Sequence, residues 1–182
     1  QEKFIADAND SAPYLDEEWD SSCGGHVNIK GEGVTIKSVK KYAGLIYALY
    51  RRRLVNSYSK YNKPLEDGNG GGERYCAIRS KNNGIVEFRL VSAVRHAEQL
   101  IWRYKIFRKL VEAIKDDTTF RGFWQRCLPI LKEVYSDDKI SYIRKLAFDF
   151  DKYLQTGEVS DRVRPFIIDD TYNLDAEDRE SI

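Results

Sequence analysis

The chain has 182 residues, of which 42% are hydrophobic and 32% are charged, and its formal net charge is +1. This composition is typical of one globular domain and excludes collagen-like, coiled-coil, disordered and repeat-array proteins. The most apolar run, Tyr42–Tyr50, is far shorter than the roughly 20 residues of a membrane-spanning helix. The chain also lacks the sequence pattern of a signal peptide, so we expect a location in the cytoplasm or within a larger particle, not secretion.

Charge is divided unevenly along the chain. Residues 1–22 carry a net charge of −6, residues 159–182 carry −4, and the body between them carries +11. We therefore expect an acidic N-terminal arm (1–22), a folded domain (23–158) and an acidic C-terminal tail (159–182). A basic body suits an anionic ligand, but a solvated helix surface neutralised by the chain's own ends explains the pattern as well.

The first half of the chain predicts a short strand followed by a long helix. Residues 1–22 contain Pro13 and little periodicity, which indicates an extended arm or loop. In 26–30, Val27 and Ile29 alternate with polar residues, as in a half-buried strand. From Thr35 to Leu54, apolar residues recur at helical spacing, and Thr35 suits the N-cap.

A loop and a hairpin follow. Residues 56–73 are rich in Asn, Ser and Gly and predict a long loop. Strands are expected at Tyr75–Ile78 and Ile85–Val91, joined across Lys81–Gly84. The Asn-Asn-Gly sequence in this connection is typical of a tight hairpin.

The remainder predicts helices at 92–114, at 119–134 with a break or kink near Pro129, and at 137–154 with Ser136 as N-cap. An apolar segment at 166–168 is expected to dock onto the domain. The pattern as a whole predicts an α+β fold, in which a small antiparallel sheet packs against several long helices.

Two candidate sites lie on predicted strands. Gly24 and Gly25 precede the first strand and allow a sharp turn or close approach to a ligand, and His26 and Asn28 share one strand face. An imidazole and a carboxamide so placed suit a metal and a ligand, although a histidine beside glycine is also commonly structural. On the later strand Glu87 and Arg89 share a face, where they could bind a cation and a phosphate or form an ordinary surface pair.

A third candidate is a pair of arginines, Arg74 and Arg79, which flank the strand expected to pair with Glu87. Both could also be ordinary surface residues. Taken in order, Gly-Gly-His-Val-Asn, Arg-x-x-x-x-Arg and Ile-Val-Glu-Phe-Arg resemble the amidoligase family of carboxylate–amine ligases, which is related to glutamine synthetase and glutamate–cysteine ligase. The resemblance covers about residues 21–115 and corresponds to the C-terminal half of the glutamine-synthetase-like catalytic fold.

The resemblance implies a role for each matching residue. His26 and Glu87 correspond to metal ligands, here for magnesium, and the arginines that match those contacting phosphate and substrate are Arg74, Arg79 and Arg89. It also implies that ATP is bound with the help of Gly24, Gly25, Asn28 and Arg53.

Two departures from the family pattern bear on activity. Asn28 stands where the family has a second histidine, and no Glu-x-Glu strand precedes Ser22. Because Gln1 opens a chain without methionine, we expect a processed product or a segment of a longer protein, with an upstream segment or partner chain completing the sheet.

The implied reaction joins a carboxylate to an amine through an acyl phosphate. Two alternatives remain at this stage. One is a non-catalytic structural or interaction protein on a degenerate ligase scaffold, such as a processed component of a larger assembly. The other is a nucleic-acid binder, which the basic body and interleaved tyrosines permit but do not favour.

Overall fold

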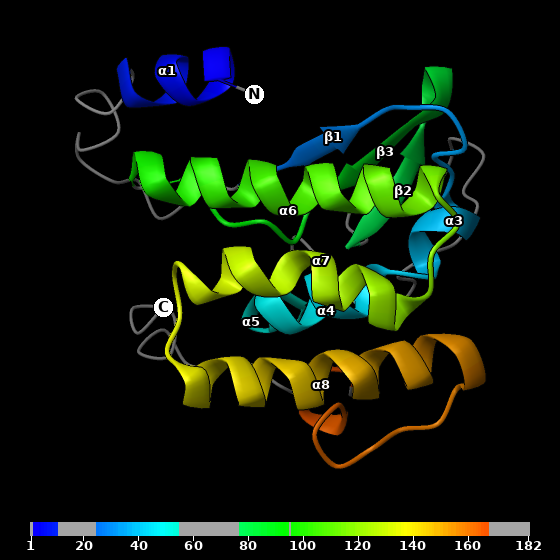
Figure 1. Cartoon of the computed structure of the whole chain (residues 1–182). Helices are drawn as coiled ribbons and strands as arrows, with labels where there is room; N and C mark the ends of the chain where they lie inside the picture. Colours follow the sequence, from blue (N-terminus) through cyan, green and yellow to red (C-terminus); the bar gives the residue numbers. More distant parts are fainter. Residues whose placement is uncertain (1, 11–24, 55–76, 95, 168–182) are drawn as a thin grey trace.

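The computed structural model describes residues 2–10, 25–54, 77–94 and 96–167 and confirms the predicted α+β fold (Figure 1). A three-stranded antiparallel sheet lies behind helix α6 (Ala97–Lys115). Helices α7 (Phe120–Lys132), α4 (Ala43–Leu49) and α8 (Asp137–Thr156) follow on the other side of α6. Within the described residues, no helix is long and apolar enough to cross a lipid bilayer.

The sheet has the order β1-β3-β2, with β1 at Val27–Ile29, β2 at Ile78–Lys81 and β3 at Ile85–Phe88. The first strand and the hairpin are therefore confirmed, but the bounds of the hairpin strands differ from the prediction. Strand β2 begins at Ile78, where the expected strand was to end, and β3 ends at Phe88 rather than at Val91. The turn is a 3₁₀ segment in which Asn83 has φ 66° and Gly84 has φ 69°. These two residue types tolerate positive φ, which lets the pairing run up to the turn.

The helix expected over 35–54 is instead three short helices, α3 (Ile36–Lys40), α4 and α5 (Arg51–Leu54). Thr35 is the N-cap of α3, as predicted, and its side chain accepts a hydrogen bond from Ser38 N at 3.1 Å. The helix breaks at Tyr42, whose hydroxyl donates to the carbonyl oxygens of Ala113 (3.0 Å) and Thr118 (2.6 Å). Periodicity is preserved across this break, which is why the sequence pattern does not reveal it.

The expectation of an extended N-terminal arm is wrong for its first part. Residues Glu2–Asp10 form helix α1, which packs against α6. Phe4 stacks on Tyr104 with 4.0 Å between ring centroids, and Ala8 is buried. The spacing of four between Phe4 and Ala8 places both side chains on one helical face, and contact with α6 stabilises the short helix. Residues 11–22 lie outside the described part of the chain.

The three long helices confirm the predicted pattern with shifted ends. Helix α6 begins at Ala97 rather than Ser92, because the backbone before it is extended, as at His96. Helix α7 continues through Pro129, so a break there was the wrong expectation. Ser136 is the N-cap of α8, as predicted, and Gly157, with φ 77°, ends the helix in the left-handed region that glycine favours.

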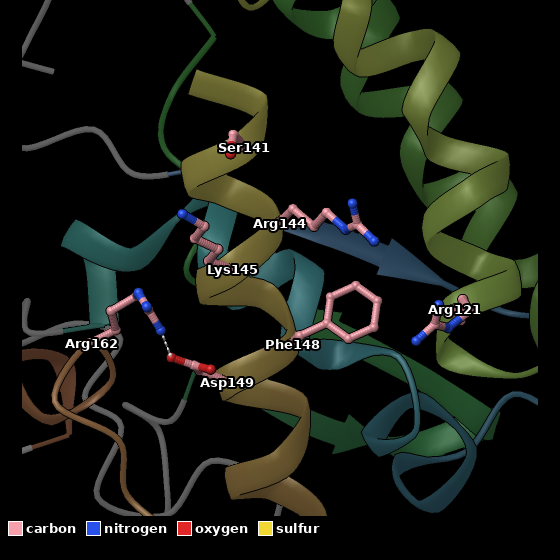
Figure 2. A pocket seen from close by; sticks show the side chains of 7 residues that line it. All are labelled: Arg121, Ser141, Arg144, Lys145, Phe148, Asp149 and Arg162. Atoms are coloured by element: carbon pink, nitrogen blue, oxygen red, sulfur yellow. Dashed lines mark hydrogen bonds and ion pairs between the residues drawn. The ribbon is translucent and has the colours of Figure 1, made fainter. Parts of the chain in front are cut away.

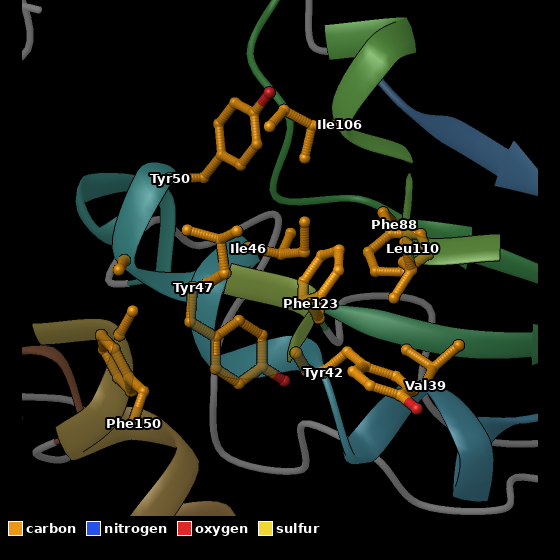
Figure 3. Close-up of a cluster of buried hydrophobic side chains, with 14 of the residues drawn as sticks. Val39, Tyr42, Ile46, Tyr47, Tyr50, Phe88, Ile106, Leu110, Phe123 and Phe150 are labelled. Carbon is orange, nitrogen blue, oxygen red and sulfur yellow. The ribbon is translucent and has the colours of Figure 1, made fainter. Parts of the chain in front are cut away.

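The core lies between the sheet and the helices (Figure 3). Edge-to-face ring contacts join Phe88 to Phe107 across the sheet–α6 interface and Tyr47 to Phe150 across the α4–α8 interface. A Cβ atom at Gly44 would lie 2.6 Å from the carbonyl oxygen of Ala147, so glycine is needed for the close approach of α4 and α8.

Two other features of the core are the apolar segment after α8 and the thiol of Cys127. The predicted docking of 166–168 is confirmed for Phe166 and Ile167, which pack against the core, whereas Ile168 lies outside the described residues. Cys127 is a free, buried thiol on α7, and burial raises its pKa.

Candidate anion-binding site on the sheet

The two faces of the sheet differ in chemistry. Strand alternation turns Val27, Phe88 and Ile78, which are paired across the three strands, toward the core. The next row places Asn28 opposite Glu87 and Glu87 opposite Arg79 on the other face. Three of the residues singled out from the sequence are therefore adjacent across the sheet.

Glu87 is the centre of this polar row. It is 2% exposed, and its carboxylate accepts a hydrogen bond from Arg79 Nε on one oxygen and from Lys81 Nζ, at 3.3 Å, on the other. Arg89 Nη1 lies 3.6 Å from the oxygen that Arg79 contacts. Burial alone would raise the pKa of Glu87, but the hydrogen bonds from Arg79 and Lys81 outweigh it, so the pKa is lowered and the carboxylate stays ionised.

The cluster carries more positive than negative charge. Three basic side chains surround the single carboxylate of Glu87. The Arg89 side chain is only 15% exposed, and its buried Nε has no hydrogen-bond partner among the described residues. Guanidinium groups held next to a further cation are suited to a phosphate or carboxylate ligand.

His26 and Asn28, at and beside the edge strand β1, are exposed. The structure thus places Asn28 next to Glu87, and His26 immediately before the same strand. Among the residues that the structure describes, no group of three or more His, Cys, Asp or Glu side chains is placed to hold a metal ion. Because the Glu87 carboxylate is already bound by basic side chains, these residues do not fit a magnesium site.

The glycine pair has a structural explanation at Gly25. Its backbone N–H donates to the carbonyl of Val91 at 3.1 Å, and a Cβ atom there would lie 2.5 Å from the carbonyl oxygen of Ser92. Close packing of two backbone segments therefore requires glycine at this position. Gly24 and Arg74, both predicted to bind ligand, lie outside the described residues.

Arg53, also predicted to bind the nucleotide, lies on α5, which packs against α4 and the 3₁₀ segment η2 (Arg164–Phe166). Burial lowers the pKa of its guanidinium. Because Arg53 lies on a helix, the strand pairing that brings Asn28, Glu87 and Arg79 together does not place Arg53 with them.

Sequence reasoning missed two basic residues. Lys81 lies two residues after Arg79 and therefore shares its strand face, and this spacing could have indicated Lys81 as a member of the site. Arg103 on α6 is 6% exposed and donates to the carbonyl (2.7 Å) and hydroxyl (2.8 Å) of Ser92. Its burial could not be read from helical periodicity, because its partners lie in the segment before α6.

No protein-family model, curated protein or solved structure matches this chain. A proposal about its function therefore depends on the chemistry of the site and on the motifs that carry the resemblance.

Proposed function

We propose that this chain supplies an anion-binding face to an ATP-dependent carboxylate–amine ligase of the amidoligase type. The observation that carries the proposal is the group of Arg79, Lys81 and Arg89 around the ionised Glu87, next to Asn28 on the neighbouring strand. Excess positive charge held in fixed positions is what transfer of a phosphoryl group requires.

The proposed reaction has two steps. A substrate carboxylate oxygen attacks the γ-phosphorus of ATP, which forms an acyl phosphate and releases ADP. An amine then attacks the carbonyl carbon, the bond from that carbon to the phosphate oxygen breaks, and the amine nitrogen loses a proton. The products are an amide and inorganic phosphate, and no side-chain nucleophile is needed.

Each residue has a role in keeping with its surroundings. Arg79 and Arg89 stabilise the charge that develops on the transferred phosphoryl group, and Asn28 donates a hydrogen bond to the nucleotide. Glu87 acts in this proposal by holding the basic side chains in place, since it accepts hydrogen bonds from Arg79 and Lys81 and forms an ion pair with Arg89.

The anion-binding part of the proposal is tested by calorimetry with ATP. Arg89→Gln removes one of the two guanidinium groups of the cluster, so we expect ATP to bind about tenfold more weakly. The matched control is Arg108→Gln, which removes one charge from an exposed ion pair with Glu112 on α6 and should leave the affinity unchanged. Equal ATP affinity in Arg89→Gln and the parent chain would contradict the proposal.

The ligase part is tested with hydroxylamine, which converts acyl phosphates to hydroxamates. With ATP, magnesium chloride and a panel of carboxylates, we expect hydroxamate and ADP to form in equal amounts. ADP formation that does not depend on any carboxylate would argue against a ligase.

A second candidate function is a structural or interaction protein that retains the scaffold. The observation that favours it is that Glu87 is satisfied by basic side chains of its own chain, so the cluster also serves as a structural network. It would be preferred if Arg89→Gln lowered the unfolding free energy but no nucleotide bound to the parent chain.

A further inference from the structure

A cavity of about 320 Å³ lies on the outer side of the helices, between α7, α8 and the segment after α8 (Figure 2). Figure 1 places α8 on the far side of α7 and α4 from the sheet, so this cavity is separate from the polar face of the sheet. Its lining combines basic, hydroxyl and aromatic side chains. They are Arg121, Ser141, Arg144, Lys145, Phe148, Asp149 and Arg162.

The lining is strongly basic. Its single carboxylate, Asp149, is already engaged, since it accepts hydrogen bonds from Arg162 Nη1 (2.5 Å) and Ser160 Oγ (2.9 Å). Within the described part of the chain, Arg121, Arg144 and Lys145 form no ion pair. Three uncompensated positive charges therefore line one cavity.

Phe148 holds two of these charges in place. The guanidinium carbons of Arg121 and Arg144 each lie 5.9 Å from the centre of its ring, and they approach it from α7 and α8 respectively (Figure 2). The ring is itself fixed by edge contacts with Phe120 and Trp124, at centroid distances of 5.0 and 6.3 Å. This arrangement reduces the freedom of both arginines before any ligand binds.

Contact with the ring leaves the hydrogen-bonding edges of the guanidinium groups available. The N–H bonds of arginine lie in the guanidinium plane and match the spacing of phosphate oxygens. Lys145 adds a third cation and Ser141 adds a hydroxyl donor on α8. The side chains thus supply positive charge, directional hydrogen-bond donors and a fixed aromatic ring at one place.

We propose that this cavity binds the phosphate groups of a small ligand that carries at least a diphosphate. Three uncompensated cations are matched better by a diphosphate than by a single carboxylate. The volume suits a small molecule, and the arginines over Phe148 compete with a nucleic-acid base for its ring, which disfavours base stacking. The proposal is independent of the function proposed for the sheet.

The test measures binding of inorganic pyrophosphate by calorimetry, without added metal and at about 0.15 M salt, where weak long-range attraction is screened. We expect one pyrophosphate to bind in the cavity, with an affinity that depends on the cavity arginines, whereas a pyrophosphate bound at the sheet would be insensitive to them. Arg121→Gln and Arg144→Gln should each weaken binding about tenfold. Asp149→Asn should strengthen it several-fold, because it releases Arg162 from its ion pair. Circular dichroism establishes that each variant is folded.

A control separates this cavity from general electrostatics. Lys132→Gln removes one exposed charge at the end of α7, outside the cavity. It should leave the affinity of the cavity for pyrophosphate within about twofold of the parent value.

Three results would overturn the proposal. The first is no pyrophosphate binding at millimolar concentration, and the second is equal weakening in Lys132→Gln and Arg144→Gln. The third is binding of a single-stranded oligonucleotide, at a site sensitive to Arg144→Gln, that pyrophosphate does not displace. That last result would assign the surface to nucleic acid rather than to a small phosphate ligand.

Discussion

Replacing Glu87 by glutamine tests whether the cluster on the sheet depends on a buried charge. Breaking a buried ion pair by removing one partner costs about 3–5 kcal/mol. The cost should be smaller here, because the side chains of Arg79 and Lys81 remain 29% and 38% exposed and can be hydrated. We therefore expect Glu87→Gln to lower the unfolding free energy by about 2 kcal/mol at pH 7.

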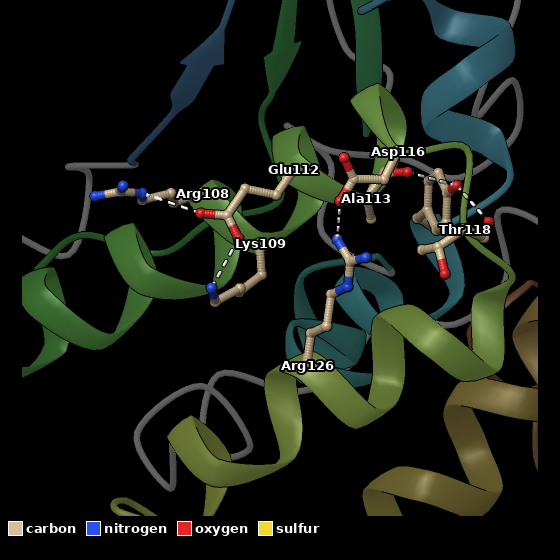
Figure 4. A network of polar contacts seen from close by, with 8 residues as sticks. Arg108, Lys109, Glu112, Ala113, Asp116, Thr118 and Arg126 are labelled. Carbon is tan, nitrogen blue, oxygen red and sulfur yellow. Dashed lines mark hydrogen bonds and ion pairs between the residues drawn. The ribbon is translucent and has the colours of Figure 1, made fainter.

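The chain offers a matched control in Glu112, which also has two basic partners, Lys109 at 2.7 Å and Arg108 at 3.2 Å (Figure 4). Its side chain is 36% exposed, compared with 3% for Glu87, so Glu112→Gln should cost at most about 0.5 kcal/mol. Urea unfolding followed by the fluorescence of the buried Trp102 and Trp124 measures both variants. Equal losses in the two variants would refute the reasoning.

The stability difference between the parent chain and Glu87→Gln should depend on pH. The pKa of Glu87 is lowered in the folded state from its usual 4.5. The stabilisation from its ionised carboxylate is therefore fully present above about pH 4.5 and is lost as the pH falls through the lower, folded-state pKa. The difference in unfolding free energy between the parent chain and Glu87→Gln should therefore shrink below that pH. A difference that grew would contradict a stabilising role for the ionised carboxylate.

Three further predictions concern packing and charge elsewhere. Gly44→Ala should cost about 2–3 kcal/mol in urea unfolding, because the added Cβ meets the carbonyl oxygen of Ala147 at 2.6 Å. Arg103→Lys should cost about 2 kcal/mol, since an ammonium cannot reproduce the forked contact with the carbonyl and hydroxyl of Ser92. Burial raises the pKa of Asp151 from 3.8, so Asp151→Asn should stabilise the chain by about a few tenths of a kcal/mol at pH 7. This gain should shrink as the pH falls through the raised folded-state pKa, and it should be absent below 3.8.

Local patterns were sufficient to predict the elements that local interactions define. The α8 helix follows from its apolar spacing and from Ser136, and the β2–β3 hairpin follows from residues that accept positive φ. The break at Tyr42 could not be predicted, because the hydroxyl that accompanies it bonds to residues 71 and 76 positions away in the sequence. Helix α1 was missed because a helix this short needs a partner surface.

Local sequence patterns also predicted part of the candidate site. Alternation along one strand places Glu87 and Arg89 on a common face, and this needs no tertiary knowledge. The alignment of Asn28 and Arg79 with Glu87 requires the strand order and register. The register also turns the apolar face toward the core, where Phe88 contacts Phe107 of α6, and a slip of one residue would expose that face.

The buried thiol of Cys127 has a consequence for measuring the motions of the core. Burial raises its pKa, so the reactive thiolate is suppressed while α7 stays packed. In a variant with serine at positions 23 and 76, alkylation would take place only after α7 separates from its neighbours. The alkylation rate would then report how often this helix opens, under conditions in which the rest of the chain remains native.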